Sequence, residues 1–317
     1  MRPASYLTNK LRDPGFWGDN AAVIGLIVIC CIFSVLTPTF LTWANISDLL
    51  VSASILLVLA MAQQFVIVTG GIDLSIGSSL PWAAVIFGLT FNSYHSIPLA
   101  IVASIVSGMA VGLLNGLIIA KLKVNDFIAT LGMLGVMNGL ALIVSGGQSF
   151  AVDSPFLQNL VLGSIGPIRY FYLVALLIAV LAYLVFTYTP FGTHVLATGG
   201  NRDAARNMGI STDRMRILVY LIGGGLVGVA AVLMVARTGG SDPSMQTSQL
   251  LTSIASVVLG GSSLFGGRAG ILGTVAGALV LTTLLVGFTL LQVSEYYQPI
   301  AVGIVVIAAA VLSRLQR

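Results

Sequence analysis

Charged side chains are scarce in this sequence. Asp, Glu, Lys and Arg together make up 8% of its 317 residues, whereas soluble domains carry about 25%. Hydrophobic residues make up 57%. A chain with so little charge cannot cover its own surface in water, so most of its exterior is expected to face lipid. The composition excludes an ordinary soluble domain and predicts an integral membrane protein.

Several chemical motifs are also missing. The two cysteines, Cys30 and Cys31, are adjacent, so they predict neither a disulfide framework nor a metal site. No Gly-x-x-x-x-Gly-Lys-Ser/Thr run is present to hold the phosphates of ATP, and no Ser-His-Asp set is evident. We therefore expect no catalytic residue, metal or cofactor in this chain. The net charge of +4 is too scattered to follow nucleic acid. Residues 1–20 lack a signal peptide's apolar core and are interpreted as a cytoplasmic tail.

Long apolar runs, by contrast, are abundant. Separated by Pro, Gly and charge, they predict an all-α polytopic membrane protein in which residues 1–317 form one domain. Ten runs qualify as membrane-spanning helices: 21–37, 49–68, 76–92, 98–120, 127–145, 170–187, 215–236, 250–264, 271–290 and 298–313. The small-xxx-small spacing of Gly108, Gly112 and Gly116 predicts close helix packing in the fourth run.

The basic residues test this count of spans. If the chain starts inside and the spans alternate, twelve of the 14 Lys and Arg residues fall on the cytoplasmic side, and only Arg169 and Arg237 fall outside. Such a bias is what the positive-inside rule requires. Both termini are therefore predicted to be cytoplasmic, and so is the loop 188–213 between the sixth and seventh runs.

This loop holds the stretch "ATGGNRDAARNMG" at 197–209, which is polar and basic. Asn201 is placed to cap a short helix over 202–208, and Gly209 is placed to close it. Four residues at i, i+3, i+4 and i+7 are expected on one face of that helix: Arg202, Ala205, Arg206 and Gly209. An ordinary basic loop touching anionic lipid is the alternative interpretation.

The stretch "THVLATGGNRDAARNMGIS" (193–211) resembles the cytoplasmic loop of ribose-type ATP-binding cassette sugar importers, in the branched-chain amino acid/ribose permease family. Three further segments resemble that family's motifs: "VIVTGGIDLSIGSSL" (66–80), "VNDFIATLGML" (124–134) and "IASVVLGGSSLFGGRAGILGTVAGAL" (254–279). One position departs from the family, because Thr252 stands where an Asp is common. The resemblance leaves the identity of the sugar open.

The resemblance implies a type II importer-like fold in a bacterial inner membrane. It implies that the loop 188–213 carries a coupling helix, which docks on a separate ATPase subunit that binds ATP and Mg²⁺. The residues matching that pattern are Gly199, Gly200, Asn201, Arg202, Ala205, Arg206 and Gly209. A second permease copy or a homologue, a periplasmic sugar-binding protein and membrane lipid are the other implied partners.

Two glycine breaks interrupt the apolar runs in a weak internal repeat, at Gly70 and Gly71 and again at Gly260 and Gly261. Breaks at corresponding places indicate a transport pathway. Within or near the first break lie four polar candidates for that pathway: Gln63, Gln64, Asp73 and Ser75. Helix capping by Asp73, and hydrogen bonding of the glutamines to neighbouring helices, are equally open interpretations.

Two rival functions remain at the sequence level. An ion-coupled secondary transporter usually keeps several ionisable groups within its spans, and Asp73 is the only acidic candidate here. An importer of another small polar solute, such as an amino acid, would have the same architecture.

Overall fold

The computed structural model describes residues 21–244 and 248–315. The proposed cytoplasmic tail, residues 1–20, lies outside this part. The helices are α3 Ala21–Leu36, α4 Trp43–Val68, α5 Ile76–Tyr94, α6 Ile97–Lys121, α7 Asp126–Ser145, α8 Pro155–Leu162, α9 Tyr170–Tyr188, α10 Pro190–Gly200, α11 Arg202–Asn207, α12 Thr212–Thr238, α13 Ser248–Leu259, α14 Ile271–Leu290 and α15 Gln298–Leu315, with a 3-10 turn at Glu295–Tyr297. The all-α prediction is confirmed.

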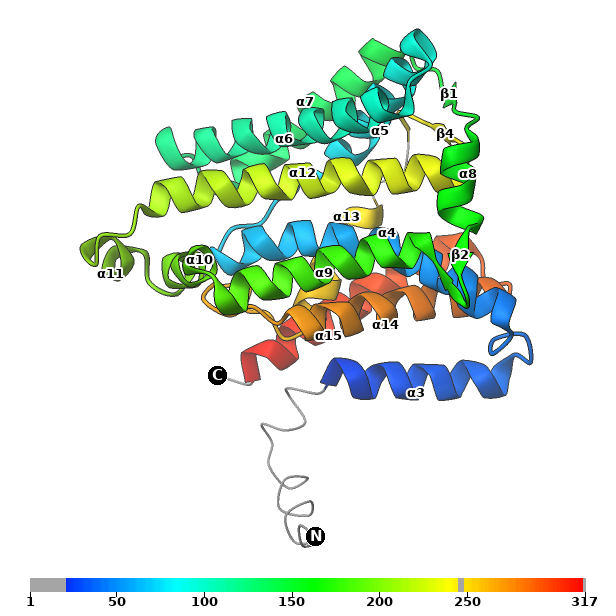
Figure 1. Cartoon of the computed structure of the whole chain (residues 1–317). Helices are drawn as coiled ribbons and strands as arrows, with labels where there is room; N and C mark the ends of the chain where they lie inside the picture. Colours follow the sequence, from blue (N-terminus) through cyan, green and yellow to red (C-terminus); the bar gives the residue numbers. More distant parts are fainter. Residues whose placement is uncertain (1–20, 245–247, 316–317) are drawn as a thin grey trace, which may run out of the picture.

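Strands are limited, in the described part, to two short antiparallel pairs. β1 Phe150–Ala151 pairs with β4 Gly240–Ser241, and β2 Ser164–Ile165 pairs with β3 Ile168–Arg169. Both pairs lie with α8 at one end of the molecule, opposite α10 and α11 (Figure 1). The long helices run side by side between these two ends.

Six helices within residues 21–244 and 248–315 are long and apolar enough to cross a membrane: α4, α6, α7, α9, α12 and α14. The other four predicted runs coincide with α3, α5, α13 and α15. Of these, α13 ends at Leu259 rather than at the predicted 264 because the backbone turns at Gly260 and Gly261, where Gly261 has a φ of +81°. The structure thus supports a multi-pass membrane protein.

The apolar surfaces divide the helices into an inner and an outer set. In the most apolar window of α4, 89% of residues are buried, against 28% in α6, α7 and α9. Helix α4 therefore forms the centre of the bundle, while the outer helices present apolar side chains to their surroundings. Gly108 and Gly112 of α6 approach the backbone of α12 so closely that a Cβ would overlap the carbonyls of Gly224 and Tyr220. The predicted small-residue packing is confirmed.

One helix was not predicted. The sixth predicted run ends at 187 and the loop 188–213 was expected to hold a helix over 202–208, but a further helix, α10, begins at Pro190. Proline disfavours a helical conformation in the preceding residue, so Thr189 is extended and α9 ends. The Thr189 hydroxyl then accepts the Gly192 N–H at 3.1 Å and starts a new helix. The loop 188–213 is therefore largely helical.

Candidate functional site

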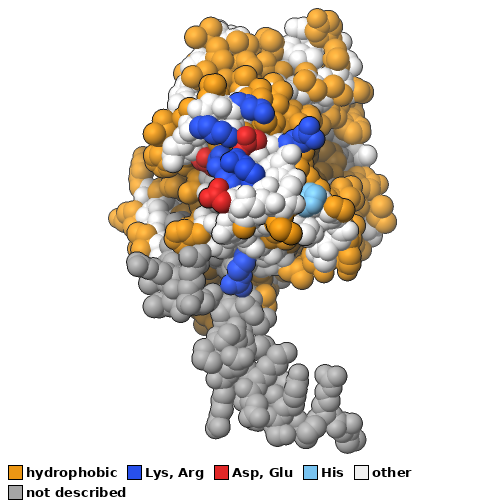
Figure 2. Space-filling view, turned by 90° about the vertical axis from the view of Figure 1, so that its left-hand side faces the viewer, with side chains coloured by type: hydrophobic (Ala, Val, Ile, Leu, Met, Phe, Trp, Pro, Cys, Tyr) orange, Lys and Arg blue, Asp and Glu red, His pale blue; other side chains and the backbone are white. Residues whose placement is uncertain are grey.

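Charged side chains gather at the end of the molecule formed by α10 and α11. Figure 2 shows this end face-on, with Lys, Arg and Asp side chains grouped inside a hydrophobic margin. Two pockets of about 480 and 420 Å³ lie there. The charged residues that line them or pair beside them are Lys121, Lys123, Asp126, Arg202, Arg206, Asp213, Arg214 and Arg216. The basic members all belong to the set predicted to face the cytoplasm.

Helix α11 has the capping that its sequence predicts. The Asn201 side chain accepts the Ala204 N–H at 2.9 Å, which satisfies one free donor at the helix start. At the other end, Gly209 has a φ of +84°, and the Ile210 N–H donates to the Ala205 carbonyl at 3.0 Å. The helix is therefore fixed at both ends by hydrogen bonds within its own segment.

The side chains of α11 divide into a packed face and a free face. Ala205 is buried against the rest of the chain, whereas Arg206 and Asn207 are exposed. Arg202 is half-buried, and burial, followed by repulsion from Arg216, lowers the pKa of its guanidinium. Met208, which directly follows the helix, is 83% exposed. Sequence reasoning missed Met208, although an apolar residue in a polar run was a usable signal.

Ion pairs join α11 to the neighbouring helices. Arg206 lies 3.6 Å from Asp213 at the start of α12, and Lys123 donates to the same carboxylate at 2.7 Å. These pairs are largely exposed and contribute little to stability. A second pair, Arg216 with Asp126, lies deeper, with side-chain exposures of 8% and 19%. This buried pair holds the start of α7 against α12.

The end of α10 meets the end of α4 and the segment between α13 and α14 at one point. The Gly267 N–H donates to the carbonyl of Val68, the last residue of α4, at 2.9 Å. A Cβ on Gly199 would overlap that same carbonyl, and a Cβ on Gly266 would lie 2.7 Å from the Gly199 oxygen and 2.8 Å from the Gly70 nitrogen. Only glycine fits at these positions. We call Gly70, Gly199, Gly266 and Gly267 the glycine junction.

The remaining glycines of the prediction pack elsewhere. Gly71 approaches Tyr220, whose hydroxyl would be 3.0 Å from an added Cβ. Gly260 lies against α14, where a Cβ would overlap the backbone of Thr274. Gly200 lies beside Gly267 and lines the pocket of about 480 Å³. Sequence reasoning placed Gly70 and Gly260 as equivalent breaks, but their contacts differ.

The polar candidates of the first break bond to one another. In the amide orientation that satisfies both of its polar atoms, Gln63 pairs with the Asp73 backbone through two hydrogen bonds of 3.2 Å. The Asp73 carboxylate accepts the Ser75 N–H at 2.9 Å and its hydroxyl at 2.6 Å. Asn115 of α6 donates to the Ser75 hydroxyl at 2.8 Å. All four residues are buried, so this group fixes the turn between α4 and α5.

Gln64 makes the matching connection to the second break. Its side-chain oxygen accepts the hydroxyls of Ser262 at 2.9 Å and Thr274 at 2.7 Å. The Ser262 hydroxyl in turn accepts the Gly270 N–H at 2.9 Å. The amide of Gln64 therefore holds α4 against the segment between α13 and α14.

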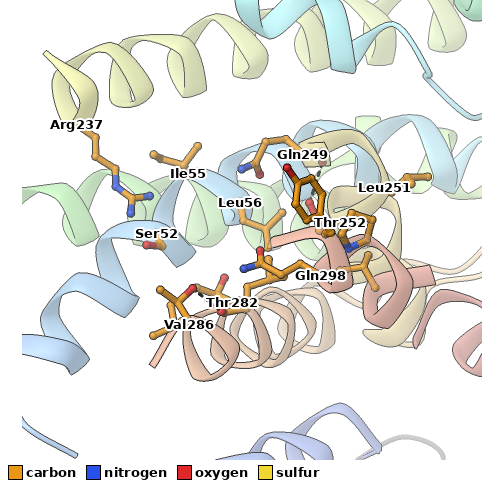
Figure 3. Close-up of a pocket in the computed structure, with 15 residues that line it drawn as sticks. Ser52, Ile55, Leu56, Arg237, Gln249, Leu251, Thr252, Thr282, Val286 and Gln298 are labelled. Atoms are coloured by element: carbon orange, nitrogen blue, oxygen red, sulfur yellow. Dashed lines mark hydrogen bonds between the residues drawn. The ribbon is translucent and has the colours of Figure 1, made fainter. Parts of the chain in front are cut away.

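A larger pocket, of about 680 Å³, lies at the other half of the bundle (Figure 3). Its polar lining includes Ser52, Arg237, Gln249, Thr252, Thr282 and Gln298. None of the eight pathway candidates is among the described residues that line it. Two residues of the sequence could have indicated this pocket. Thr252 stands where the family's usual Asp is missing, and Arg237 is one of two basic residues predicted on the outer side of the membrane.

An apolar helical bundle with six helices long enough to span a membrane, among the described residues, is the architecture of a multi-pass membrane protein. The family described as "Branched-chain amino acid transport system / permease component" matches residues 45–310, and the chain belongs to this family. It is a multi-pass protein of the inner membrane, and the predicted family resemblance is confirmed.

Curated relatives resemble the chain over nearly its whole length. The ribose import permease protein RbsC of Escherichia coli (strain K12) is 35% identical over 308 residues, which cover 93% of both chains. RbsC of Bacillus subtilis (strain 168) is 36% identical over 312 residues, 96% of this chain and 95% of the relative. The L-arabinose ABC transporter permease protein AraH of Azospirillum brasilense is 33% identical over 310 residues, 96% of this chain and 90% of the relative. No solved structure matches the chain.

Proposed function

We propose that this chain is the permease subunit of an ATP-binding cassette importer and that its solute is a sugar or a related polyol. The names of its relatives, which are permeases for ribose and L-arabinose, support the substrate class. A branched-chain amino acid or another small polar solute is the second candidate, because the family description names such a solute.

The proposed membrane arrangement has ten spans with both termini in the cytoplasm. Each of the ten predicted runs coincides with a helix, and the basic residues gather at the α10–α11 end, which would face the cytoplasm. The exposed apolar side chains of α6, α7 and α9 would contact lipid. A second copy of this chain, or a homologue, would complete the transport pathway, and a periplasmic binding protein would deliver the solute from outside.

The observation that carries the proposal is the contact of Gly199, near the end of α10, with Val68 at the end of α4 and with Gly267 between α13 and α14. A partner ATPase, which would hold ATP and Mg²⁺, docks on the exposed side of α11 formed by Arg206, Asn207 and Met208. Gly199 leaves no gap against Val68 and Gly267. A displacement of α11 would therefore be passed directly to the end of α4 and to the segment between α13 and α14.

An uptake assay with the complete complex tests the coupling role. Arg206→Glu reverses the charge on the free side of α11, so we expect ATP-driven uptake to be abolished while the amount of protein in the membrane is unchanged. Arg206→Lys, which keeps the charge, should retain most of the uptake. Full uptake with Arg206→Glu would contradict the docking of α11.

The energy source is tested in sealed vesicles. We expect uptake that requires ATP and persists when an uncoupler removes the ion gradient. Uptake that continues without ATP and stops with the uncoupler would instead identify an ion-coupled transporter.

A further inference from the structure

The pocket of about 680 Å³ extends from the outer end of the bundle into the membrane-spanning part. Arg237 is one residue from the end of α12, and Tyr296 and Gln298 lie in and after the turn that precedes α15. Thr282 lies eight residues before the end of α14, which corresponds to about 12 Å along a helix. The pocket therefore opens at the end of the bundle opposite α11 and extends from that end into the membrane-spanning part.

The lining of this pocket is unsuited to lipid. Two amides, a guanidinium and several hydroxyls line it, from α4, α12, α13, α14 and the start of α15. Exposing such groups to hydrocarbon is costly, so they face water or another protein. Figure 3 shows Arg237 directed towards Ser52 of α4, with Gln249 and Gln298 on the other side of the space. The polar groups converge from opposite walls.

The chemistry of the lining fits a polyol. Amides and hydroxyls donate to and accept from the hydroxyls of a sugar, while Ile55, Leu56 and Val286 supply apolar walls for its C–H faces. The guanidinium adds a fork of donors and a positive charge. The carboxylate within electrostatic range of Arg237 is Asp48, which also lies 3.7 Å from Arg169, so two cations share it.

We propose that this pocket is a solute-binding site in the outer half of the transport pathway and that it takes a hydroxyl-rich neutral solute. Arg237 contacts this solute and disfavours positively charged ones. The proposal rests on the proposed importer function and assigns the residues that would select the solute.

Charge-selective thiol labelling tests the pocket without ATP, partner proteins or sugar. The purified permease is held in lipid nanodiscs, with Cys30 and Cys31 replaced by Ser. Ser52→Cys then supplies the one reactive thiol as a reporter. The probes are a cationic trimethylammonium and an anionic sulfonate methanethiosulfonate. We expect the anionic-to-cationic rate ratio to fall about tenfold when Arg237→Gln is added, because one unit charge acts on both reagents in opposite directions.

Two further reporters make the outcome decisive. Gln298→Cys lies on the opposite wall, and its anionic-to-cationic rate ratio should fall by the same factor. It keeps the test possible if the Ser52→Cys variant does not fold. Ser93→Cys, at the exposed far end of α5, is the matched control, and its ratio should not change with Arg237→Gln. Reporters at 52 and 298 that do not react, or that keep their ratio, would overturn the proposal.

Uptake by the complete complex, with ribose as the probe, tests the contact with the solute. Arg237→Gln should raise the KM at least tenfold with little change in kcat, and Arg237→Lys should recover part of the loss. An unchanged KM would overturn the contact. A wild-type complex without ATP-driven uptake of ribose or of any other sugar or polyol would contradict the proposed function, and the labelling result would still test the pocket.

Discussion

Polar residues at the two ends of the bundle are used in different ways. At the α11 end, Gln63, Gln64 and Asp73 are buried and hydrogen-bonded within the chain. In the large pocket, the side chains of Arg237 and Gln298 make no hydrogen bond to any residue that the structure describes. Buried hydrogen bonds between helices hold those helices together, whereas groups that line open space are available to a solute. The difference fits the two proposed roles, transmission at the α11 end and solute binding in the large pocket.

The glycine junction should be the most sensitive part of this comparison. Gly199→Ala places a Cβ where the Val68 carbonyl lies, and backbone on both sides prevents a local adjustment. We expect ATP-driven uptake to fall more than tenfold, measured with the complete complex. Gly135→Ala in α7 is the matched control, because no atom lies within 4 Å of its added Cβ. Equal uptake by the two variants would contradict the junction's role.

The buried ion pair should have the next largest effect. Asp126→Asn leaves the Arg216 guanidinium, which is 8% exposed, without its carboxylate. The expected cost is about 3 kcal/mol, seen as a Tm in detergent several degrees lower. Lys123→Gln removes an exposed ion pair and should cost only about 0.5 kcal/mol. A Tm that falls equally in both variants would show that burial does not distinguish the two pairs.

The smallest effect on stability is expected in the large pocket. Gln298→Leu removes a half-buried amide that makes no hydrogen bond to the described residues, so stability should change by no more than about 0.5 kcal/mol. Uptake should nevertheless weaken through a higher KM. Gln64→Leu is the comparison, since it breaks two buried hydrogen bonds and should lower the Tm clearly. Similar Tm values for both would remove the distinction between the two ends.

Much of the fold could be predicted from the sequence because apolar runs and their interruptions are local signals. The ten runs, the Asn201 cap and the Gly209 closure depend only on neighbouring residues. Helix α10 was missed because Pro190 follows the end of an apolar run, yet proline also fits the first turn of a new helix. The boundary of α13 was misplaced because Gly260 was included in an apolar run.

The site was less predictable because it depends on contacts distant in the sequence. Gly70, Gly199 and Gly267 are about 70 to 200 residues apart, and no local pattern indicates that they touch. The alternatives for Asp73 and Gln64 were visible in the sequence. In the structure the Asp73 carboxylate accepts the N–H of Ser75, the residue before α5, and the Gln64 oxygen accepts the Ser262 hydroxyl. The lining of the large pocket comes from five helices, so its residues appeared only as scattered polar positions.

The central claim is that α11 faces the cytoplasm and docks on an ATPase. The most direct measurement places a single cysteine at Asn207, which is exposed, with Cys30 and Cys31 replaced by Ser. A membrane-impermeant thiol reagent should label it in inside-out vesicles but not in intact cells, and the partner ATPase should block the labelling. Labelling in intact cells, or labelling that the bound ATPase leaves unchanged, would contradict the claim.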